Sequence, residues 1–358
     1  MSFNPARPNN LALLPPELPP IDSEVNSVLL KARVALAELK GACGQIPNPL
    51  LLTAPLVIRE SVASSNIENI NTTLEEVLQG QLFPEGERRT PDKEVLRYRE
   101  ALYLGNKMMR ESALSSRTIL AIQEALTSGK QSGYRRTQNK IINSATGETL
   151  YTPPAANELP VLISNWEKYA NDKAVVVDPL IRAAVCHYQF ESIHPFGDGN
   201  GRTGRILMVL QLVQDGVIDM PVLYISGYIN KNRPEYYRLL RAINAGGSWR
   251  DYLLFMLNGF WLQALETNDN ITRIADLFRE TKATLKANHG KIYSADLVEA
   301  MFSYPVLTPT KLAAELGIHY TTASRYLLQL AKTEIMREAK VGKHHLFANK
   351  KLLDVLSQ

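Results

Sequence analysis

The sequence predicts a mainly α-helical protein, and three observations support this fold class. Apolar residues recur at helical spacing in segment after segment, and a clear case is the run Val25, Val28, Leu29, Ala32, Leu36 and Leu39. Helix start signals precede such runs, as where Asp178 is followed by Pro179. The pattern of a β-hairpin is confined to a segment near residue 145 and to the C-terminal region. Because 358 residues is long for one domain, we expect units at 1–110, 111–270 and 271–358.

The composition favours a folded protein of the cytoplasm. Hydrophobic residues make up 45% of the chain, which is enough for a sizeable core. No apolar run reaches the roughly 18 residues of a membrane span, and residues 1–21 lack the regions of a signal peptide, so no membrane partner is expected. Cys43 and Cys186 both lie in apolar helical patterns, which argues against a disulfide framework. The net charge of +4 permits an acidic partner without requiring one.

Helices are expected in order after a proline-rich arm at residues 1–21, which should lie extended on the surface. Helical periodicity predicts helices over residues 22–40, 53–69, 74–82, 94–110, 116–126, 158–171, 179–190, 202–214, 236–244, 249–265 and 271–287. Gly41 and Gly44 should end the first helix, and Thr72 or Thr73 should cap the third. Residues 84–93 should form an exposed loop. β-Branched pairs around Ala145-Thr146-Gly147 predict a small hairpin. The alternative interpretation of this pattern is an ordinary surface turn.

The segment 193–205 carries the densest set of reactive side chains. It contains one His, one Asp, one Asn, two Arg and four Gly, and the apolar run 206–212 follows it. This order predicts a glycine-rich loop at a helix N-terminus, where free N–H groups and the helix dipole bind anions. Arg202 and Arg205 should share one face of that helix, Asp198 could bind Mg²⁺, and His194 can accept a proton. Together these groups indicate phosphoryl or nucleotidyl transfer.

Two familiar glycine motifs do not fit this segment. Residues 199–204 formally match G-x-G-x-x-G, but the dinucleotide fingerprint requires a preceding strand, and residues 178–190 predict a helix. A phosphate-binding P-loop requires G-K-S/T, which is absent, as is the set of protein-kinase motifs. A loop with a structural histidine is the remaining alternative, and the neighbouring Asp, Asn and Arg side chains favour a functional site.

At these residues the sequence resembles the Fic family of protein adenylyltransferases, whose motif is H-x-F-x-D/E-G-N-G-R-x-x-R. Every fixed position is present, as His194, Phe196, Asp198, Gly199, Asn200, Gly201, Arg202 and Arg205. The resemblance implies transfer of AMP from ATP to a Ser, Thr or Tyr hydroxyl of a target protein. In that scheme His194 deprotonates the hydroxyl, Asp198 holds Mg²⁺, and Phe196 anchors the loop. The phosphates would be bound by Asn200, Arg202, Arg205 and the amides of Gly197, Gly199 and Gly201.

A second resemblance concerns control of the activity. Residues 64–69 read Ser-Ser-Asn-Ile-Glu-Asn and fit the inhibitory motif S/T-x-x-x-E-G/N of many Fic proteins, in the subclass with an N-terminal inhibitory helix. The resemblance implies that Glu68, on a segment beginning at Ser64, pairs with Arg205 and blocks seating of the ATP γ-phosphate. A solvated glutamate near a helix end is the alternative.

The resemblance also implies binding roles for the hairpin and for the segment near residue 240. In Fic proteins a hairpin flap at this place docks the target backbone as an added strand. The resemblance also implies that Ile141 and Ile142 lie over the nucleotide. Tyr236, Tyr237 and Asn244 resemble the adenine and ribose pocket, since aromatic faces stack on a purine and an amide can read its edge. Core and surface positions are the alternative for these three residues.

The C-terminal unit resembles a winged helix-turn-helix. Apolar spacing predicts two short helices in residues 308–330 around a turn that contains Gly317, and a basic hairpin tip follows with Lys340 and Lys343. The start of the second helix could contact DNA through Tyr320, Thr321, Thr322, Ser324 and Arg325. Acidic neighbours reduce the positive charge, and the alternative is a docking module or a homodimer contact.

Three functional hypotheses follow. The first is an autoinhibited AMP transferase that uses ATP and Mg²⁺ and modifies a target protein or itself. The second is a DNA-binding regulator whose Fic core senses a nucleotide. The third keeps the site but changes the reaction, with Glu68 orienting water to remove AMP from a modified protein. A different nucleotide donor would require only small changes in the pocket.

Overall fold

A computed structural model describes residues 3–44, 49–129, 133–143, 146–174, 176–341 and 344–357. The predicted mainly α-helical class is confirmed, with helices α1(Ser23–Gly44), α2(Pro49–Ile67), α3(Leu74–Gly80), α4(Thr90–Glu111), α5(Ser116–Thr127), α6(Leu159–Asn171), α7(Pro179–Ile193), α8(Asn200–Gln214), α9(Ile225–Lys231), α10(Arg233–Asn244), α11(Trp249–Asn288), α12(Ala295–Ser303), α13(Pro309–Leu316), α14(Tyr320–Lys332) and α15(Lys350–Leu356). Short 3₁₀ turns lie at Glu85–Glu87 and Ala156–Glu158.

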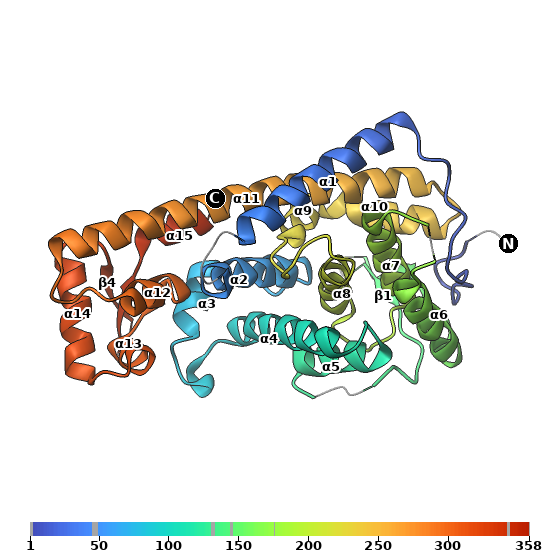
Figure 1. The fold of residues 1–358 in the computed structure, drawn as a ribbon. Helices are drawn as coiled ribbons and strands as arrows, with labels where there is room; N and C mark the ends of the chain where they lie inside the picture. The colour runs from blue at the N-terminus through green and yellow to red at the C-terminus, as the bar shows by residue number, and fades with distance from the viewer. Residues whose placement is uncertain are drawn as a thin grey trace.

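Helix α8 lies at the centre of the N-terminal three-quarters of the chain (Figure 1). It contacts α2, α4, α5, α7 and α9, and nearly every side chain from Asn200 to Leu212 is buried. An isolated amphipathic helix would show one apolar stripe, whereas a helix enclosed by neighbours can be apolar on all sides. The uninterrupted apolar run 206–212 is therefore the sequence of a central helix.

The longest helix, α11, joins this core to the C-terminal unit (Figure 1). Its first half runs parallel to α1: Arg250 pairs with Asp22 and Glu24 at the start of both helices, and Lys31 lies 4.7 Å from the Trp261 ring centre further along. Two separate helices had been expected at 249–265 and 271–287, but the polar residues between them do not interrupt the helix. The predicted unit boundary at residue 270 thus falls within one continuous helix.

Two other local predictions were partly wrong. Of the two glycines expected to end the first helix, Gly44 is its last residue, whereas Gly41 lies within the helix. The charged segment 84–93 is only partly a loop: α4 begins at Thr90, with Pro91 in the first turn, where a missing N–H costs nothing. The expected cap at Thr73 is confirmed, since its side chain accepts from the Glu76 amide and Glu76 returns the bond to the Thr73 N–H.

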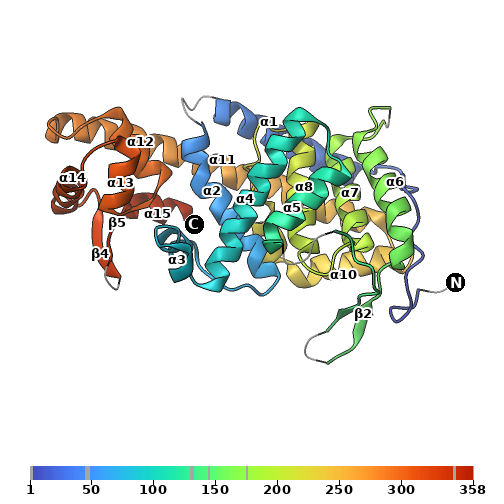
Figure 2. The same cartoon turned by 90° about the horizontal axis from the view of Figure 1, so that it is seen from below.

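The two predicted β-hairpins are both present. Strands β1(Ile141–Ile142) and β2(Thr149–Tyr151) form an antiparallel flap that projects from the helical body (Figure 2); Ser144 and Ala145 of its turn lie outside the described residues. In the C-terminal unit, β3(Val306–Leu307), β5(His344–Ala348) and β4(Arg337–Val341) form a sheet in the order β3-β5-β4 beside α12–α14. This is the predicted winged helix-turn-helix arrangement, with Lys343 outside the described part and α15 as an unpredicted last helix.

The proline-rich arm lies extended along the base of the flap, as expected. The Asn9 amide donates to the Thr152 carbonyl at 3.0 Å, and the Leu14 amide donates to Asn165 Oδ1 at 2.7 Å. The arm thereby ties the flap to the helical core. Among the helices that the structure describes, none combines the length and apolar character needed to cross a membrane.

The crossing of α4, α5 and α8 depends on a glycine, and a matched pair of substitutions tests this. A Cβ at Gly105 would lie 2.7 Å from Leu210 Cδ1 and 2.8 Å from Ile122 Cδ1, whereas a Cβ at Gly41 would have no atom within 4 Å. We expect Gly105→Ala to lower the free energy of unfolding by about 1–3 kcal/mol through overpacking. Gly41→Ala should raise it by up to about 1 kcal/mol through helix propensity. Urea unfolding measures both, and equal effects of the two substitutions would contradict the packing explanation.

Candidate active site

The glycine-rich loop connects the end of α7 to the start of α8. His194 ends α7 in the left-handed region, with φ 47°, and Gly199 precedes α8 with φ 80°. Asn200 closes the loop: its Oδ1 accepts from the Phe196 amide at 2.8 Å and its Nδ2 donates to the Phe196 carbonyl at 2.9 Å. A left-handed histidine is uncommon and is typical of functional sites. Because both polar atoms of Asn200 are used in the loop, this side chain shapes the backbone here.

Phe196 and Arg135 hold this loop against the body of the protein. Phe196 is fully buried, and its ring lies 5.4 Å from that of Tyr134. The buried Arg135 guanidinium donates from Nε to the His194 carbonyl at 3.0 Å and also bonds the Pro154 carbonyl after the flap. The Arg135 amide donates to the Pro195 carbonyl at 2.8 Å. The flap and the histidine loop are therefore fixed to each other, a role for Arg135 that no pattern in the sequence indicated.

His194 carries its imidazole at the wall of a cavity. Its Nδ1 lies 3.2 Å from the Glu191 carbonyl, which orients the ring. Burial lowers the pKa of His194 to about 4, and the hydrogen bond to the Glu191 carbonyl and the nearby Glu68 carboxylate only partly oppose that effect. At neutral pH the imidazole is therefore unprotonated, which is the form that can accept a proton.

Arg205 lies fully buried between α8 and the end of α2. Its Nε donates to Ser64 Oγ at 2.8 Å, and its Nη2 donates to the Ser64 carbonyl at 2.9 Å and to Glu68 Oε1 at 2.8 Å. Burial alone would raise the pKa of Glu68, but the charge and hydrogen bond of Arg205 lower it below its usual range. Both partners are thus ionised, and the predicted Glu68–Arg205 pair is present in the structure.

Two small residues make this pair possible. Asn69 has φ 61°, a left-handed conformation that Gly and Asn adopt most readily, which accounts for an Asn after Glu68. A Cβ at Gly201 would lie only 2.2 Å from Glu68 Oε1. The carboxylate of Glu68 therefore occupies the space directly above the first turn of α8, where an anion would approach the helix.

Arg202 and Asp198 lie apart from that pair. Arg202 Nη1 donates to Glu94 Oε2 of α4 at 3.0 Å, and its Nη2 is 3.5 Å from Asp198. Although Arg202 and Arg205 share a helix, their guanidinium groups have different partners. The Asp198 side chain is 62% exposed at the loop surface, and its Oδ1 accepts from the Gly199 amide.

A cavity of about 430 Å³ lies beneath the flap. Of the predicted site residues, Glu68, Ile141, Ile142, His194, Gly201, Arg205, Tyr236, Tyr237 and Asn244 line it. Ser64, Gly197, Asp198, Gly199, Asn200 and Arg202 do not. The remaining lining residues were not predicted: Lys140, Leu150, Tyr151, Glu191, Ser192, Leu240 and Arg241. Residues from α2, the flap, α7, α8 and α10 thus meet around one space of ligand size.

The α10 side of the cavity differs from a simple aromatic pocket. Tyr236 is buried and its hydroxyl lies 2.8 Å from His187 Nε2, whereas Tyr237 is half-buried. Asn244 Oδ1 accepts from Asn9 Nδ2 at 2.8 Å and from the Tyr188 hydroxyl at 3.0 Å. The N-terminal arm therefore supports Asn244, which lines the cavity. Sequence spacing could not indicate this contact, because 235 positions separate the two residues.

Glu191 is a second carboxyl group in the same cavity. Burial raises its pKa to about 7, against the attraction of Arg205. A Cβ at Gly204 would lie 2.3 Å from Glu191 Oε1, so the glycine in the second turn of α8 makes room for it.

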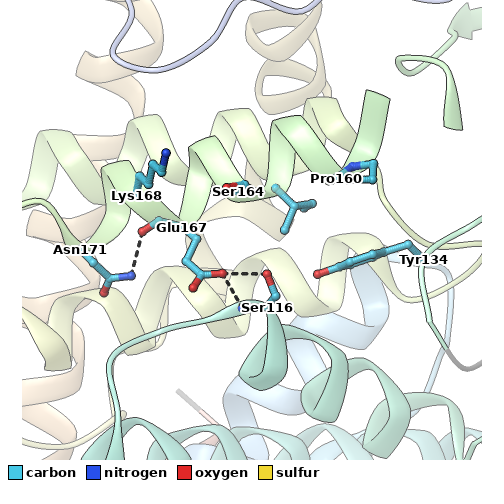
Figure 3. Close-up of a pocket in the computed structure, with 8 residues that line it drawn as sticks. Ser116, Tyr134, Pro160, Ser164, Glu167, Lys168 and Asn171 are labelled. Atoms are coloured by element: carbon cyan, nitrogen blue, oxygen red, sulfur yellow. Dashed lines mark hydrogen bonds between the residues drawn. The ribbon is translucent and has the colours of Figure 1, made fainter. Parts of the chain in front are cut away.

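A second hollow, of about 530 Å³, lies between α5 and α6 (Figure 3). Glu167 accepts there from the Ser116 amide at 2.9 Å and from Ser116 Oγ at 2.7 Å. The Tyr134 ring faces the same hollow while it packs on Phe196. None of the predicted site residues lines this hollow, which makes the cavity beneath the flap the candidate active site.

Comparison with known proteins agrees with this geometry. Residues 27–107 match the Fic/DOC family N-terminal domain, residues 113–212 match the Fic/DOC family, and residues 277–352 match the C-terminal domain of SoFic-like protein adenylyltransferases. A probable protein adenylyltransferase of Aquifex aeolicus is 27% identical over 307 residues, which cover 79% of this chain and 83% of that protein. The protein adenylyltransferase Fic of Aedes aegypti is 37% identical over 97 residues, 27% of this chain but only 18% of its own length.

Solved structures share the fold. A Fic family protein from Desulfovibrio desulfuricans superposes with a TM-score of 0.58 at 20% identity, covering 92% of this chain and 96% of its own. A Fic domain containing signaling protein from Bacteroides thetaiotaomicron gives a TM-score of 0.53 at 17% identity, over 71% of this chain and 97% of its own. With the complete motif and the matched domains, these similarities show that the chain belongs to the Fic family of protein adenylyltransferases.

Proposed function

We propose that this protein transfers AMP from ATP to a Ser, Thr or Tyr hydroxyl of a target protein or of itself, and that Glu68 restrains this activity. One observation carries the proposal: Arg205, the last arginine of the motif, is paired with Glu68 inside the cavity that His194 lines. A carboxylate and a phosphate compete for the same guanidinium donors, so the Glu68 pair opposes productive binding of a triphosphate.

In the proposed reaction His194 acts as the general base. The hydroxyl oxygen of the target forms a bond to the α-phosphorus, the bond from that phosphorus to the bridging oxygen of pyrophosphate breaks, and His194 takes the hydroxyl proton. The pKa of about 4 keeps His194 ready to accept it. Arg205, and Arg202 once released from Glu94, would stabilise the charge that develops on the phosphates.

Asp198 is the residue that would hold Mg²⁺. Its exposed carboxylate suits an ion that is commonly bound by one or two carboxylates, substrate phosphates and water. When bound, Mg²⁺ would supply charge neutralisation on the phosphates.

The target protein would bind at the flap. Ile142 of β1 is 56% exposed, and a two-stranded flap has edges at which an extended segment can add as a further strand. This mode of binding would bring a hydroxyl of the target to His194, since Arg135 joins the base of the flap to the histidine loop.

Hydrolytic removal of AMP is a second candidate reaction. In it Glu68 would orient water for the removal of AMP from a modified protein, which requires Glu68 for activity. Substitution of Glu68 therefore separates the two reactions.

DNA binding is a separate proposal for the C-terminal unit. Tyr320, Thr321, Ser324, Arg325 and Lys332 line a shallow hollow of about 560 Å³ along α14. Within the described part of the chain, neither Arg325 nor Lys332 forms an ion pair with a carboxylate. Free cations beside short hydroxyl side chains are suited to phosphate contacts in a groove of duplex DNA.

The first experiment tests the restraint by Glu68. We expect Glu68→Gly to increase transfer of label from ATP to protein by about 10-fold to 100-fold, because it removes a charge-assisted hydrogen bond worth roughly 1.5–3 kcal/mol. His194→Ala should reduce transfer by at least about 100-fold. Glu75→Ala, which removes an exposed carboxylate of α3, serves as the control and should not alter the rate. A Glu68→Gly protein no faster than the wild type would exclude the proposed restraint.

A pH profile tests the role of His194. Because its pKa is lowered to about 4, the unprotonated form persists below the usual histidine range. Since the Glu68 carboxylate raises the pKa of His194, its removal lowers that pKa further. For Glu68→Gly we expect kcat/KM to change little from pH 8 to about 5 and to decrease only near pH 4 or below. Circular dichroism controls for unfolding, and half-loss near pH 6.5 would contradict this environment for His194.

Salt-dependent binding tests the C-terminal unit. We expect the full chain to bind duplex DNA at low salt. Arg325→Ala and Lys332→Ala should each weaken binding and reduce the slope of log K against log salt concentration by about one. Lys282→Ala on α11 is the matched control. Fluorescence anisotropy at several salt concentrations measures the effect, and absence of binding at low salt would favour a docking or dimer role.

A further inference from the structure

A cavity of about 420 Å³ lies where the Fic core meets the winged helix, far along the chain from the motif. Its walls come from Ala54 and Ile58 of α2, from residues 81–103 of the α3–α4 region, and from Ser303, Tyr304 and Lys311 of the C-terminal unit. Figure 2 shows α2, α3 and α4 beside this unit, and Val306 and Leu346 of its sheet pack in one apolar cluster with α2, α3 and α4. The cavity therefore lies at a packed interface.

Two guanidinium groups are fixed in the wall of this cavity without a carboxylate partner. Arg88 donates from Nε to the Phe83 carbonyl at 2.9 Å and from Nη2 to the Gln81 carbonyl at 3.2 Å. Arg99 donates from Nη1 to Gln81 Oε1 at 3.2 Å. Neither forms an ion pair with any carboxylate in the part of the chain that the structure describes. Neutral oxygens thus hold both groups in place and leave their charge uncompensated.

The opposite wall adds a third cation. Lys311 Nζ lies 2.7 Å from Glu315 Oε1 and 4.1 Å from the centre of the Tyr304 ring. The carboxylate among the described lining residues is that of Glu100, which is exposed. Because Lys311 is paired with Glu315, the excess positive charge of the lining comes from Arg88 and Arg99.

Gln81 provides an independent sign that an acceptor belongs here. Its Nε2 is buried and has no hydrogen-bond partner within the described residues, while its Oε1 is occupied by Arg99. A buried donor without an acceptor costs free energy, so an acceptor bound nearby would stabilise this part of the wall.

We propose that this cavity is a binding site for a small phosphate-bearing anion. Two guanidinium groups held by neutral oxygens line a space of ligand size, with the Lys311 ammonium group on the opposite wall, and phosphate oxygens accept hydrogen bonds from such donors. Ala54 and Ile58 of α2 line the cavity, and the same helix carries Ser64 further along. A bound anion would therefore stabilise the position of the helix that leads to Glu68.

Calorimetric titration with inorganic pyrophosphate, in the absence of Mg²⁺, tests the site in the full chain. We expect saturable binding that weakens at least about ten-fold in Arg88→Gln/Arg99→Gln, since each arginine supplies a charge-assisted bond. Arg205→Gln, which alters the nucleotide cavity, should retain this binding. Arg110→Gln, an exposed arginine of α4 outside the cavity, is the matched control.

Three results would overturn the proposal. Absence of saturable binding removes it, and loss of binding in Arg205→Gln with retention in Arg88→Gln/Arg99→Gln would place the anion in the nucleotide cavity. An equal loss in Arg110→Gln would indicate an adventitious ion only. Circular dichroism confirms folding of each variant. Where the double variant does not fold, Lys311→Gln tests the opposite wall with the same expectation of weakened binding.

Discussion

The buried Arg205 guanidinium is the constraint on which the active site depends. A charge enclosed by protein is costly unless it is paired and hydrogen-bonded, and Arg205 lies in the middle of the central helix bundle. Its partners are the hydroxyl and carbonyl of Ser64 and the carboxylate of Glu68, all supplied by the end of α2. This requirement explains Ser64 and Glu68 in the polar stretch at the end of α2.

Helix α2 is correspondingly fixed along its length. Glu60, two turns before Glu68, is fully enclosed and accepts from the Ser226 amide at 3.0 Å and from the Tyr98 hydroxyl at 3.2 Å. Burial raises the pKa of Glu60 to about 7, opposed by its bonds to Ser226. The neighbouring Arg59 pairs with Glu266 of α11 at 2.6 Å. The helix that leads to Glu68 is thus tied to α4, α9 and α11, and it also borders the winged helix.

The Arg205 guanidinium therefore has two roles. In the structure it donates hydrogen bonds to Ser64 and Glu68 at the end of α2. In the proposed reaction it binds a phosphate. Glu68 has the exposure needed for such an exchange, with 33% of its side chain accessible, whereas Ser64 is fully buried. An incoming phosphate would replace the partly exposed carboxylate and leave the serine contacts in place. Gly201 and Gly204 keep the space around this exchange open, because a Cβ at either position would collide with a carboxylate.

The sequence by itself determined the helical class, most helix positions, the two hairpins and the complete motif, because these depend on local spacing, capping and residue type. It also indicated the Glu68–Arg205 pair through a resemblance. It failed at Gly41, where no neighbouring atom packs against the glycine and the helix continues, and across the polar middle of α11, where Thr267, Asn270 and Ile271 are buried within one continuous helix. Only the tertiary structure brought Asn9 to Asn244, Arg135 to the histidine loop and Glu94 to Arg202. It also directed the side chain of Asn200 toward the backbone of Phe196 in the same loop. Some of these contacts join residues up to 235 positions apart, and others depend on the direction of a side chain. Spacing along the chain predicts neither kind of contact, because packing between elements sets the distances in a folded core.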